Sequence, residues 1–426
     1  MPLESRRPCI LILGTNPETS RIVEVANGMN IRTVVSNPFK ESPVKRVAEV
    51  SYDIDPRDSQ AIDNLISMER VDGVILGVSD PLLPHYFAIC KRNNFPCYAN
   101  EKSVEVFSSK SSFAEMCLRF GIEPIPQYGI ASSPNFEIDP QAYPVVVKPI
   151  DSGAALGVSI CYNLSDLAEG IKSGLSHSMR KQVLVEKAMV CDDIFAYYTF
   201  INGHTFLTAI ADRRKSSKQG GLSRVCLSAD YPSQHLAKFL ESVHPKLLSM
   251  FKSIDIRNGV LCIQFFFDGA SFYAYDPGFR IQGEAPHHYI NALFGLDQLR
   301  AAINFSLGLG YVDSRVNFEP DPNFSGKVAR TVWVLGRVGT IETIQGLDDL
   351  LHDERLISVH WRVNPGDKIL EDMVGTERQV LARFHLLAQN TESINEINSQ
   401  IVNSLVVRDK EGASMIQDIF SPNLAK

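Results

Sequence analysis

Residues 143–160, YPVVVKPIDSGAALGVSI, combine a lysine with a loop of small residues in a way that could hold a polyanion. An apolar run delivers Lys148, and the chain returns to an apolar β-branched segment after the loop, which predicts two strands with a tight connection. The loop residues of interest are Ser152, Gly153, Ala154 and Gly157. Backbone N–H groups can close on an anion in such a loop, and the lysine adds a point charge. A nucleotide polyphosphate is the obvious anion, although an ordinary glycine turn beside a half-buried lysine explains this stretch alone equally well.

Two commoner phosphate-binding motifs are excluded by the sequence. The chain contains no GxxxxGK[ST] segment, which excludes a P-loop nucleoside triphosphatase. The first expected strand, 9–13, runs into Gly14 in the segment GTNPET, which lacks the GxGxxG spacing of a dinucleotide site. An anion site at Lys148 therefore has to be judged with the features that follow it.

Length and composition restrict the class of protein. A chain of 426 residues is expected to form two or three domains, and its 44% hydrophobic and 21% charged residues are typical of a soluble globular protein. No apolar run reaches the roughly 18 residues that a membrane span needs. A net charge of −7 without a basic stripe argues against a nucleic-acid partner. The eight cysteines show no CxxC or zinc spacing, which favours a reduced, cytoplasmic setting.

The first hundred residues alternate strands and helices, which predicts a small parallel sheet with helices on both faces. The expected strands are 9–13, 32–36, 73–76 and 97–98, with short elements around 47–52; the expected helices are 18–29, 58–68 and 84–92. A helix over 109–120 follows, and Gly121 is expected to end it.

From about residue 143 the pattern changes to longer strands with interspersed helices, which predicts an α+β arrangement. The expected strands are 145–148, 158–162, 183–186, 195–201, 205–211, 259–267, 271–275, 328–335 and 356–363, and the expected helices are 165–172, 234–253, 297–307 and 376–389. The predicted domains are 1–105, 106–316 with a small lid subdomain at about 143–190, and 317–426.

Taken in order, these features resemble the ATP-grasp superfamily over roughly residues 8–310. The shared order is a small parallel-sheet domain, a helix carrying Lys110, the strand and loop at Lys148, an acidic hinge, and an acidic strand that ends in Pro-x-x-Arg. The chain is most similar to the carboxylate–amine ligases of the L-amino-acid ligase and biotin-carboxylase-like group, whose C-terminal domain also carries a turn like 363–367. The resemblance implies an α/β and α+β ATP-grasp fold: an N-terminal parallel-sheet (pre-ATP-grasp) domain, two α+β ATP-binding subdomains, and a C-terminal α+β domain.

The resemblance also implies an ATP site between the two subdomains. Lys110 and Lys148 match the lysines that offset the triphosphate charge. In the superfamily, backbone groups of a hinge segment contact the edge of the adenine. The matching hinge residues here are Glu186, Lys187 and Met189. Asp193, seven residues after Glu186, matches the acid that accepts the ribose hydroxyls.

A basic, glycine-bearing segment, 212–221, matches the loop that covers the phosphates in the superfamily. Taken alone it is a solvated loop. One of Arg213, Arg214 or Lys215 is expected to reach the γ-phosphate, and the sequence leaves the choice among them open.

The expected metal site departs from the superfamily pattern, which has an acid, a second acid about twelve residues later and an asparagine two beyond that. Gln264 stands in place of the first acid and Gly278 in place of the asparagine, so that only Asp276 keeps a charge. Magnesium, or manganese in its place, needs hard oxygen ligands. One metal held by Asp276 and Gln264 is expected, and two well-held metals are less so.

Arg280 closes the segment DPGFRIQGE, and the resemblance implies that it steadies the carboxylate or its phosphorylated form. Glu284 then lies where the superfamily builds its acceptor pocket and could orient an amine. His287 and His288 are either bases or, more often for adjacent histidines, capping or packing residues.

These features predict an ATP-dependent carboxylate–amine ligase that works through an acylphosphate, with a small-molecule carboxylate and amine as substrates. No nucleic-acid or membrane partner is expected, and a homodimer is left open. A carboxylase or carbamoyl-phosphate-forming relative is the first alternative. A non-catalytic ATP-binding regulatory protein is the second, and Gln264 and Gly278 are the evidence for it.

Overall fold

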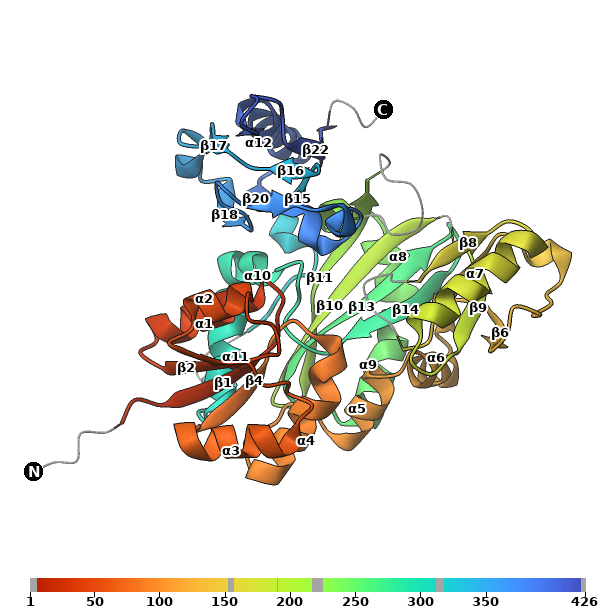
Figure 1. The fold of residues 1–426 in the computed structure, drawn as a ribbon, viewed down its shortest axis with the longest axis horizontal. Helices are drawn as coiled ribbons and strands as arrows, with labels where there is room; N and C mark the ends of the chain where they lie inside the picture. The colour runs from red at the N-terminus through yellow and green to blue at the C-terminus, as the bar shows by residue number, and fades with distance from the viewer. Residues whose placement is uncertain (1–5, 152–156, 190, 217–224, 312–317, 423–426) are drawn as a thin grey trace, which may run out of the picture.

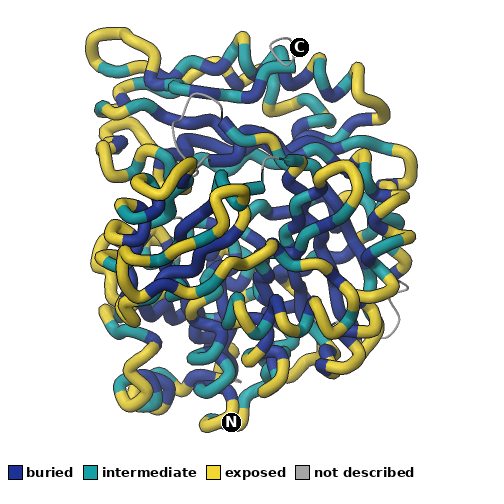
Figure 2. The backbone as a smooth tube through the Cα atoms, turned by 90° about the vertical axis from the view of Figure 1, so that its right-hand side faces the viewer, coloured by how far each residue is buried: buried dark blue, intermediate teal, exposed yellow. Residues whose placement is uncertain are grey.

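The computed structural model describes residues 6–151, 157–189, 191–216, 225–311 and 318–422. Strands in the described residues form a parallel N-terminal sheet, a long central sheet, a small lid sheet and two short ribbons (Figure 1). Buried residues lie mainly in the interior of the molecule, and exposed residues lie mainly at its periphery (Figure 2). Within the described ranges, no helix is both long and apolar enough to cross a membrane.

The N-terminal sheet is parallel and buried on both faces, in the order β3–β2–β1–β4. Its strands are β1 (Cys9–Leu13), β2 (Arg32–Ser36), β3 (Val50–Tyr52) and β4 (Gly73–Leu76), and the helices after them are α1 (Thr19–Gly28), α2 (Pro43–Val47), α3 (Ser59–Glu69) and α4 (Leu83–Asn93). Leu11 belongs to the buried cluster that includes α3 and α4, whereas Ile12 belongs to the one that includes α1 and α11 (Gln298–Ser306). Because both faces are covered, β1 and β4 are continuous apolar runs.

No strand forms at 97–98, so that prediction is wrong. These residues lead instead into α5 (Glu101–Phe107), a helix that the sequence reasoning missed and that Asn100 caps. The Tyr98 hydroxyl donates to the backbone oxygen of Phe279 at 3.1 Å, and the two rings meet edge to face. This segment therefore anchors the N-terminal domain to the end of a central strand rather than extending the parallel sheet.

The central sheet has ten strands in the order β18–β20–β15–β12–β11–β10–β13–β14–β5, with β22 also beside β15. Its strands are β5 (Glu123–Pro124), β10 (Asp192–Ile201), β11 (His204–Lys215), β12 (Cys226–Tyr231), β13 (Gly259–Phe267), β14 (Phe272–Gly278), β15 (Val328–Gly336), β18 (Leu356–Trp361), β20 (Val380–Ala388) and β22 (Ile416–Ile419). The ribbons pair β16 (Gly339–Thr340) with β19 (Lys368–Ile369) and β17 (Thr343–Gln345) with β21 (Val406–Arg408). Strands from both sides of residue 317 share this sheet, so the C-terminal segment continues the central layer.

Alternation along β10 separates the two faces of the central sheet. Ile194 and Tyr198 lie in the buried cluster that includes α8 (Leu236–Ser242) and α9 (His244–Ile254). Phe195 and Tyr197 lie in the cluster that includes β15 and β20. The second face also carries the polar side chains described below.

Two predicted helices differ from the structure. The single helix expected over 234–253 is two, α8 and α9, and Pro245 in the first turn of α9 cannot continue a preceding helix. The helix expected over 376–389 is wrong, because β20 occupies most of it and the helix, α12 (Thr391–Ser404), starts after an Asn390 cap. Both faces of β20 are buried, so its apolar residues do not alternate with polar ones and the strand period is hidden.

The lid sheet carries Lys148 and has the order β6–β9–β7–β8, covered by α7 (Leu164–His177). Its strands are β6 (Gln127–Ala131), β7 (Val145–Pro149), β8 (Ser159–Cys161) and β9 (Val183–Lys187). Ser152, Gly153 and Ala154 lie outside the described residues. Gly157 has a φ of +71°, and a Cβ there would lie 2.9 Å from the Cβ of His177, so both backbone and space require glycine.

Gly73 sets how closely the N-terminal sheet approaches α11. A Cβ at this position would lie 2.0 Å from the backbone oxygen of Ser306. Gly73→Ala is expected to lower the free energy of unfolding by about 2–3 kcal/mol, because backbone has to move away. Gly28→Ala is the matched control, since nothing lies within 4 Å of the added carbon. Urea denaturation of both variants tests this, and equal stabilities would contradict it.

Candidate functional site

The second face of the central sheet carries a polar patch on β10, β11, β13 and β14. Gln264 lies opposite Asp276 between β13 and β14, and Asp193 lies opposite Arg213 between β10 and β11. A register shift after Gln264 leaves Tyr275 as an extra residue in β14, the geometry of a β-bulge. Tyr275 stacks on Phe266, with ring centroids 4.4 Å apart, while Asp276 stays opposite Gln264.

Charged side chains from separate parts of the chain converge on Asp276. Burial raises the pKa of Asp276, and the charge of Lys110 is the strongest opposing influence. Lys148 and Arg280 also lower this pKa, which places their charges near the same carboxylate. Lys110 is the first residue of α6 (Lys110–Arg119), Lys148 lies on β7 of the lid, and Arg280 follows β14. The structure thus brings together residues that the sequence only predicted to meet.

Lys148 is held by a buried ion pair within the lid sheet. Its Nζ lies 2.5 Å from Oε1 of Glu186, and the two side chains are 14% and 7% exposed. Burial lowers the pKa of Lys148, and the Glu186 carboxylate works against that effect. The hinge beyond Glu186 is fixed through its backbone, because the N–H groups of Lys187 and Ala188 donate to Pro126 and Pro144. Met189 follows these groups and is half-buried.

Asp193 is the centre of a second charged group. Its carboxylate accepts from Arg213 at 2.6 Å and from the Tyr275 hydroxyl at 2.9 Å, and it pairs with Lys215 at 2.5 Å. Burial raises the pKa of Asp193, but Arg213 and Lys215 more than offset this and hold it below its ordinary value. The carboxylate predicted to receive ribose hydroxyls is thus already surrounded by donors.

The same geometry separates the three basic candidates on β11. Arg213 and Lys215 point toward Asp193, whereas Arg214 points away and pairs with Asp230 at 3.0 Å. Arg213 is 16% exposed and Arg214 is 54% exposed. Residues 217–221, in the rest of the predicted loop, lie outside the described residues.

Arg280 is oriented by a residue that the sequence reasoning missed. Its guanidinium donates to Oδ2 of Asp80 at 2.7 Å and to the side chain of Gln282 at 2.9 Å. Burial lowers the pKa of Arg280, but the carboxylates of Asp80 and Glu284 hold it above its ordinary value. Asp80 lies just beyond the carboxyl end of β4, where ligands bind in open parallel sheets, and that position is the signal that could have found it.

Asp80 also occupies the space beside Gly278. A Cβ added at Gly278 would lie 3.1 Å from Oδ1 of Asp80 and 3.4 Å from the guanidinium carbon of Arg280. This Oδ1 is buried and accepts no hydrogen bond from the described residues. The charge of Asp80 also raises the pKa of Asp276. Gly278 has no side chain, and the unpartnered Oδ1 of Asp80 lies next to it.

The loop that carries Glu284 is held from the C-terminal strands. Arg383 on β20 donates to the backbone oxygen of Gly283, and Nε2 of His385 lies 3.3 Å from the backbone oxygen of Glu284. No hydrogen bond from the described residues reaches the Glu284 carboxylate itself, which is half-buried near Arg280. It is therefore available to a ligand.

Comparison with solved structures identifies the fold of this chain. An L-amino acid ligase from Bacillus licheniformis superposes with a TM-score of 0.74 at 16% identity, covering 95% of this chain and 99% of that one. The chain has the ATP-grasp fold. The biotin carboxylase domain of the Hydrogenobacter thermophilus 2-oxoglutarate carboxylase, solved with MgADP and bicarbonate, matches with a TM-score of 0.70 at 16% identity over 94% of this chain and 90% of that one. The predicted fold class is confirmed.

Sequence relatives agree with this ATP-grasp assignment. Residues 133–201, which contain Lys148, Glu186 and Asp193, match the family model described as D-ala D-ala ligase C-terminus. A formate-dependent phosphoribosylglycinamide formyltransferase of Sulfurisphaera tokodaii is 26% identical over 209 residues, 47% of this chain. The match spans 51% of that relative, so this chain spans about half the length of the curated relative.

Proposed function

We propose that this ATP-grasp protein is a carboxylate–amine ligase that forms an amide or peptide bond through an acylphosphate and releases ADP and phosphate. The observation that carries the proposal is the convergence of Lys110, Lys148 and Arg280 on Asp276. Cations around one acid suit a triphosphate that has to approach a carboxylate. The solved structures with a similar fold include an L-amino acid ligase, which supports the proposal of a carboxylate–amine ligase.

The residues present fit ATP and magnesium. Lys110 and Lys148 supply positive charge for phosphates, and the hinge at Glu186–Met189 borders the lid. Asp276, Gln264 and the free Oδ1 of Asp80 offer oxygen donors of the kind that magnesium prefers, and manganese accepts the same donors. The superfamily has an asparagine ligand at the position of Gly278. We assign Asp80 to the metal ligand set in place of that asparagine.

The side chains divide the catalytic work. ATP, when bound with its metal, supplies the phosphoryl group that turns a carboxylate into a substrate with a good leaving group. Lys110 and Lys148 hold phosphate oxygens in place, and Arg280 presents its planar guanidinium to the carboxylate. Arg213 adds positive charge from β11, and the Glu284 carboxylate orients the incoming amine. Catalysis is then mainly positioning and electrostatics, and no side-chain nucleophile is needed.

Arg213 and Arg214 form a matched pair for this assignment. Arg213→Met is expected to lower kcat/KM for ATP by about 10²-fold, because a buried charge-assisted donor is lost. Arg214→Met removes a half-exposed ion pair and is expected to change kcat/KM less than about twofold and stability by less than about 1 kcal/mol. Steady-state ADP release measures both, and a larger loss in Arg214→Met would contradict the assignment.

The substrates can be found by coupling ADP and phosphate release to pooled candidates. The purified protein receives MgATP with pools of amino acids, hydroxy acids or bicarbonate, beside Asp276→Ala and Lys148→Ala. Turnover that needs one carboxylate and one amine, and that both variants lose, is expected. Turnover on bicarbonate alone would favour a carboxylase-type enzyme, and tight ATP binding without turnover in any pool would favour a regulatory nucleotide-binding protein.

The domain bounds, the substrate class, the location and the oligomeric state are also proposals. We propose the domains 1–105, 106–316, with the lid at about 143–190, and 317–426, although the central sheet runs through the last boundary. Small-molecule substrates, a cytoplasmic location and a homodimer are proposed on the same terms.

A further inference from the structure

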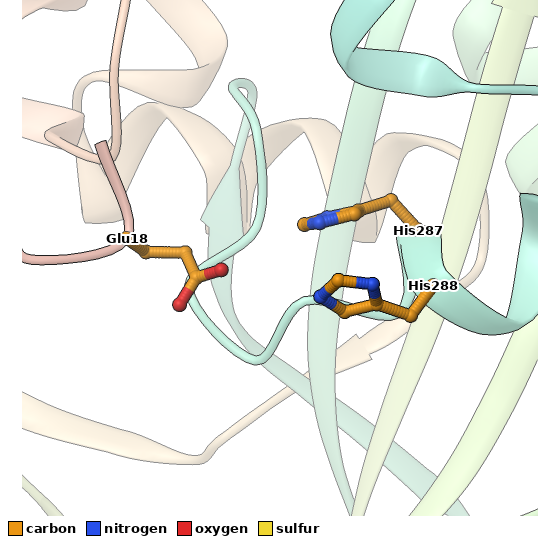
Figure 3. Close-up of side chains that lie close together, drawn as sticks. All are labelled: Glu18, His287 and His288. Atoms are coloured by element: carbon orange, nitrogen blue, oxygen red, sulfur yellow. The ribbon is translucent and has the colours of Figure 1, made fainter. Parts of the chain in front are cut away.

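Glu18, His287 and His288 form a buried cluster that the proposed ligase chemistry does not use (Figure 3). Glu18 immediately precedes α1, and the two histidines begin α10 (His287–Phe294). One ligand atom from each residue lies within 4.8 Å of the others. Figure 3 shows the Glu18 carboxylate facing both imidazole rings from the N-terminal domain.

The cluster contains buried polar atoms without partners. Oε1 of Glu18 and Nε2 of His287 are buried and form no hydrogen bond with any described residue. The Glu18 side chain is 1% exposed. A buried polar atom without a hydrogen-bond partner is energetically unfavourable, and more so when it is charged, so the two atoms together indicate a site for a ligand.

The other carboxylate oxygen of Glu18 is firmly held. Its Oε2 lies 2.9 Å from Nδ1 of His360 and 3.1 Å from the Arg383 guanidinium, both on the C-terminal strands. Hydrogen bonds of this kind orient a metal-binding carboxylate and leave its second oxygen for the ion. Oγ of Ser358, on the same strand as His360, lies 3.4 Å from Nε2 of His288.

We infer that Glu18, His287 and His288 bind one zinc ion at the junction between the N-terminal domain and α10. Two imidazoles and a carboxylate are a donor set for zinc, and three protein ligands leave a fourth position open. Ligands of a tetrahedral zinc lie roughly 3.4 Å apart, so binding draws the cluster together by about an ångström. Imidazole donors favour zinc over magnesium, which distinguishes this site from the oxygen donors at Asp276. The inference does not depend on the proposed ligase activity.

The test measures metal binding directly on the full-length, untagged protein. After dialysis against a chelator, zinc is titrated in competition with a chromophoric chelator, and bound metal is counted by elemental analysis. One zinc per chain is expected, and a tenfold molar excess of magnesium should not displace it. Cobalt, used as a coloured substitute, should give the visible absorption of nitrogen- and oxygen-ligated tetrahedral Co²⁺.

Variants locate the site. Glu18→Gln, His287→Gln and His288→Gln are each expected to weaken zinc binding at least 100-fold, whereas Asp276→Asn and the exposed His352→Gln should bind it normally. Glu18→Gln removes the partner of Arg383, so if it fails to fold, His288→Gln carries the test with circular dichroism as the folding check. Absence of stoichiometric zinc in the unmodified protein would overturn the inference. So would stoichiometric zinc that all three cluster variants retain, or that Asp276→Asn loses.

Discussion

Replacing Lys148 by methionine is expected to abolish most activity and also to destabilise the lid. Glu186 would remain as a buried carboxylate without its cation, and removing one partner of such a pair costs about 3–5 kcal/mol. Loss of the phosphate-binding charge should lower kcat by about 10²–10³-fold. Urea denaturation and steady-state ADP release measure the two effects separately.

A second substitution separates the structural role of the pair from its catalytic role. Lys148→Met combined with Glu186→Gln removes both charges from a site that is almost fully buried. The double variant is expected to recover most of the lost stability, because no unpaired charge remains. Its activity should stay as low as that of the single variant. Recovery of activity together with stability would show that Lys148 serves only the fold.

Replacing Asp276 by asparagine is expected to lower kcat by about 10³-fold while leaving the protein folded. Burial already raises the pKa of this carboxyl, which means that the fold bears a cost for its charge. A neutral amide relieves that cost, so the free energy of unfolding should stay unchanged or rise by less than about 1 kcal/mol. The large effect on rate would come from the lost anionic metal ligand.

Asp80→Asn is the comparison that tests the ligand set around Asp276. The amide keeps one oxygen but removes the charge, so the magnesium concentration for half-maximal rate is expected to rise about tenfold. Arg280 also loses its 2.7 Å ion pair with Asp80, so the KM for the carboxylate substrate should rise. A magnesium requirement unchanged in Asp80→Asn would remove Asp80 from the ligand set. Full activity in Asp276→Asn would refute the proposed metal site altogether.

Much of the fold follows from local sequence. The strand at Arg32–Ser36 and that at Gly73–Leu76 agree with their predicted bounds, because β-branched or apolar runs are bounded there by turn residues. The prediction of a helix at 376–389 is wrong, because a strand buried on both faces shows no alternation of apolar and polar residues. Pro245 predicts the division of 234–253 into two helices, because proline in the first turn of the second helix cannot continue a preceding helix.

The candidate site was predictable where residue types recur at fixed spacing and not where distant residues meet. Lys148 and Asp276 lie on strands whose flanking patterns mark them, and the structure places their charges together. The choice of Arg213 over Arg214 depends on which side of β11 faces Asp193, and an irregularity in that strand hides it from the sequence. Asp80 lies 200 residues from Arg280, and no local pattern links them.

The cluster at Glu18 shows the same limit. Adjacent histidines at 287 and 288 have no third ligand at metal spacing in the sequence, and capping or packing was the commoner interpretation. Only the docking of the N-terminal domain brings Glu18 to them.

Transfer of oxygen from substrate to phosphate is the measurement that tests the proposed ligase most directly. Once a carboxylate and an amine that support turnover are known, the carboxylate is labelled with ¹⁸O and the released phosphate is analysed by mass spectrometry. An acylphosphate leaves one substrate oxygen on phosphate when the amine displaces it, so one ¹⁸O per phosphate is expected. Unlabelled phosphate formed at the rate of turnover would show that the carboxylate is never phosphorylated, and the proposed function would be wrong.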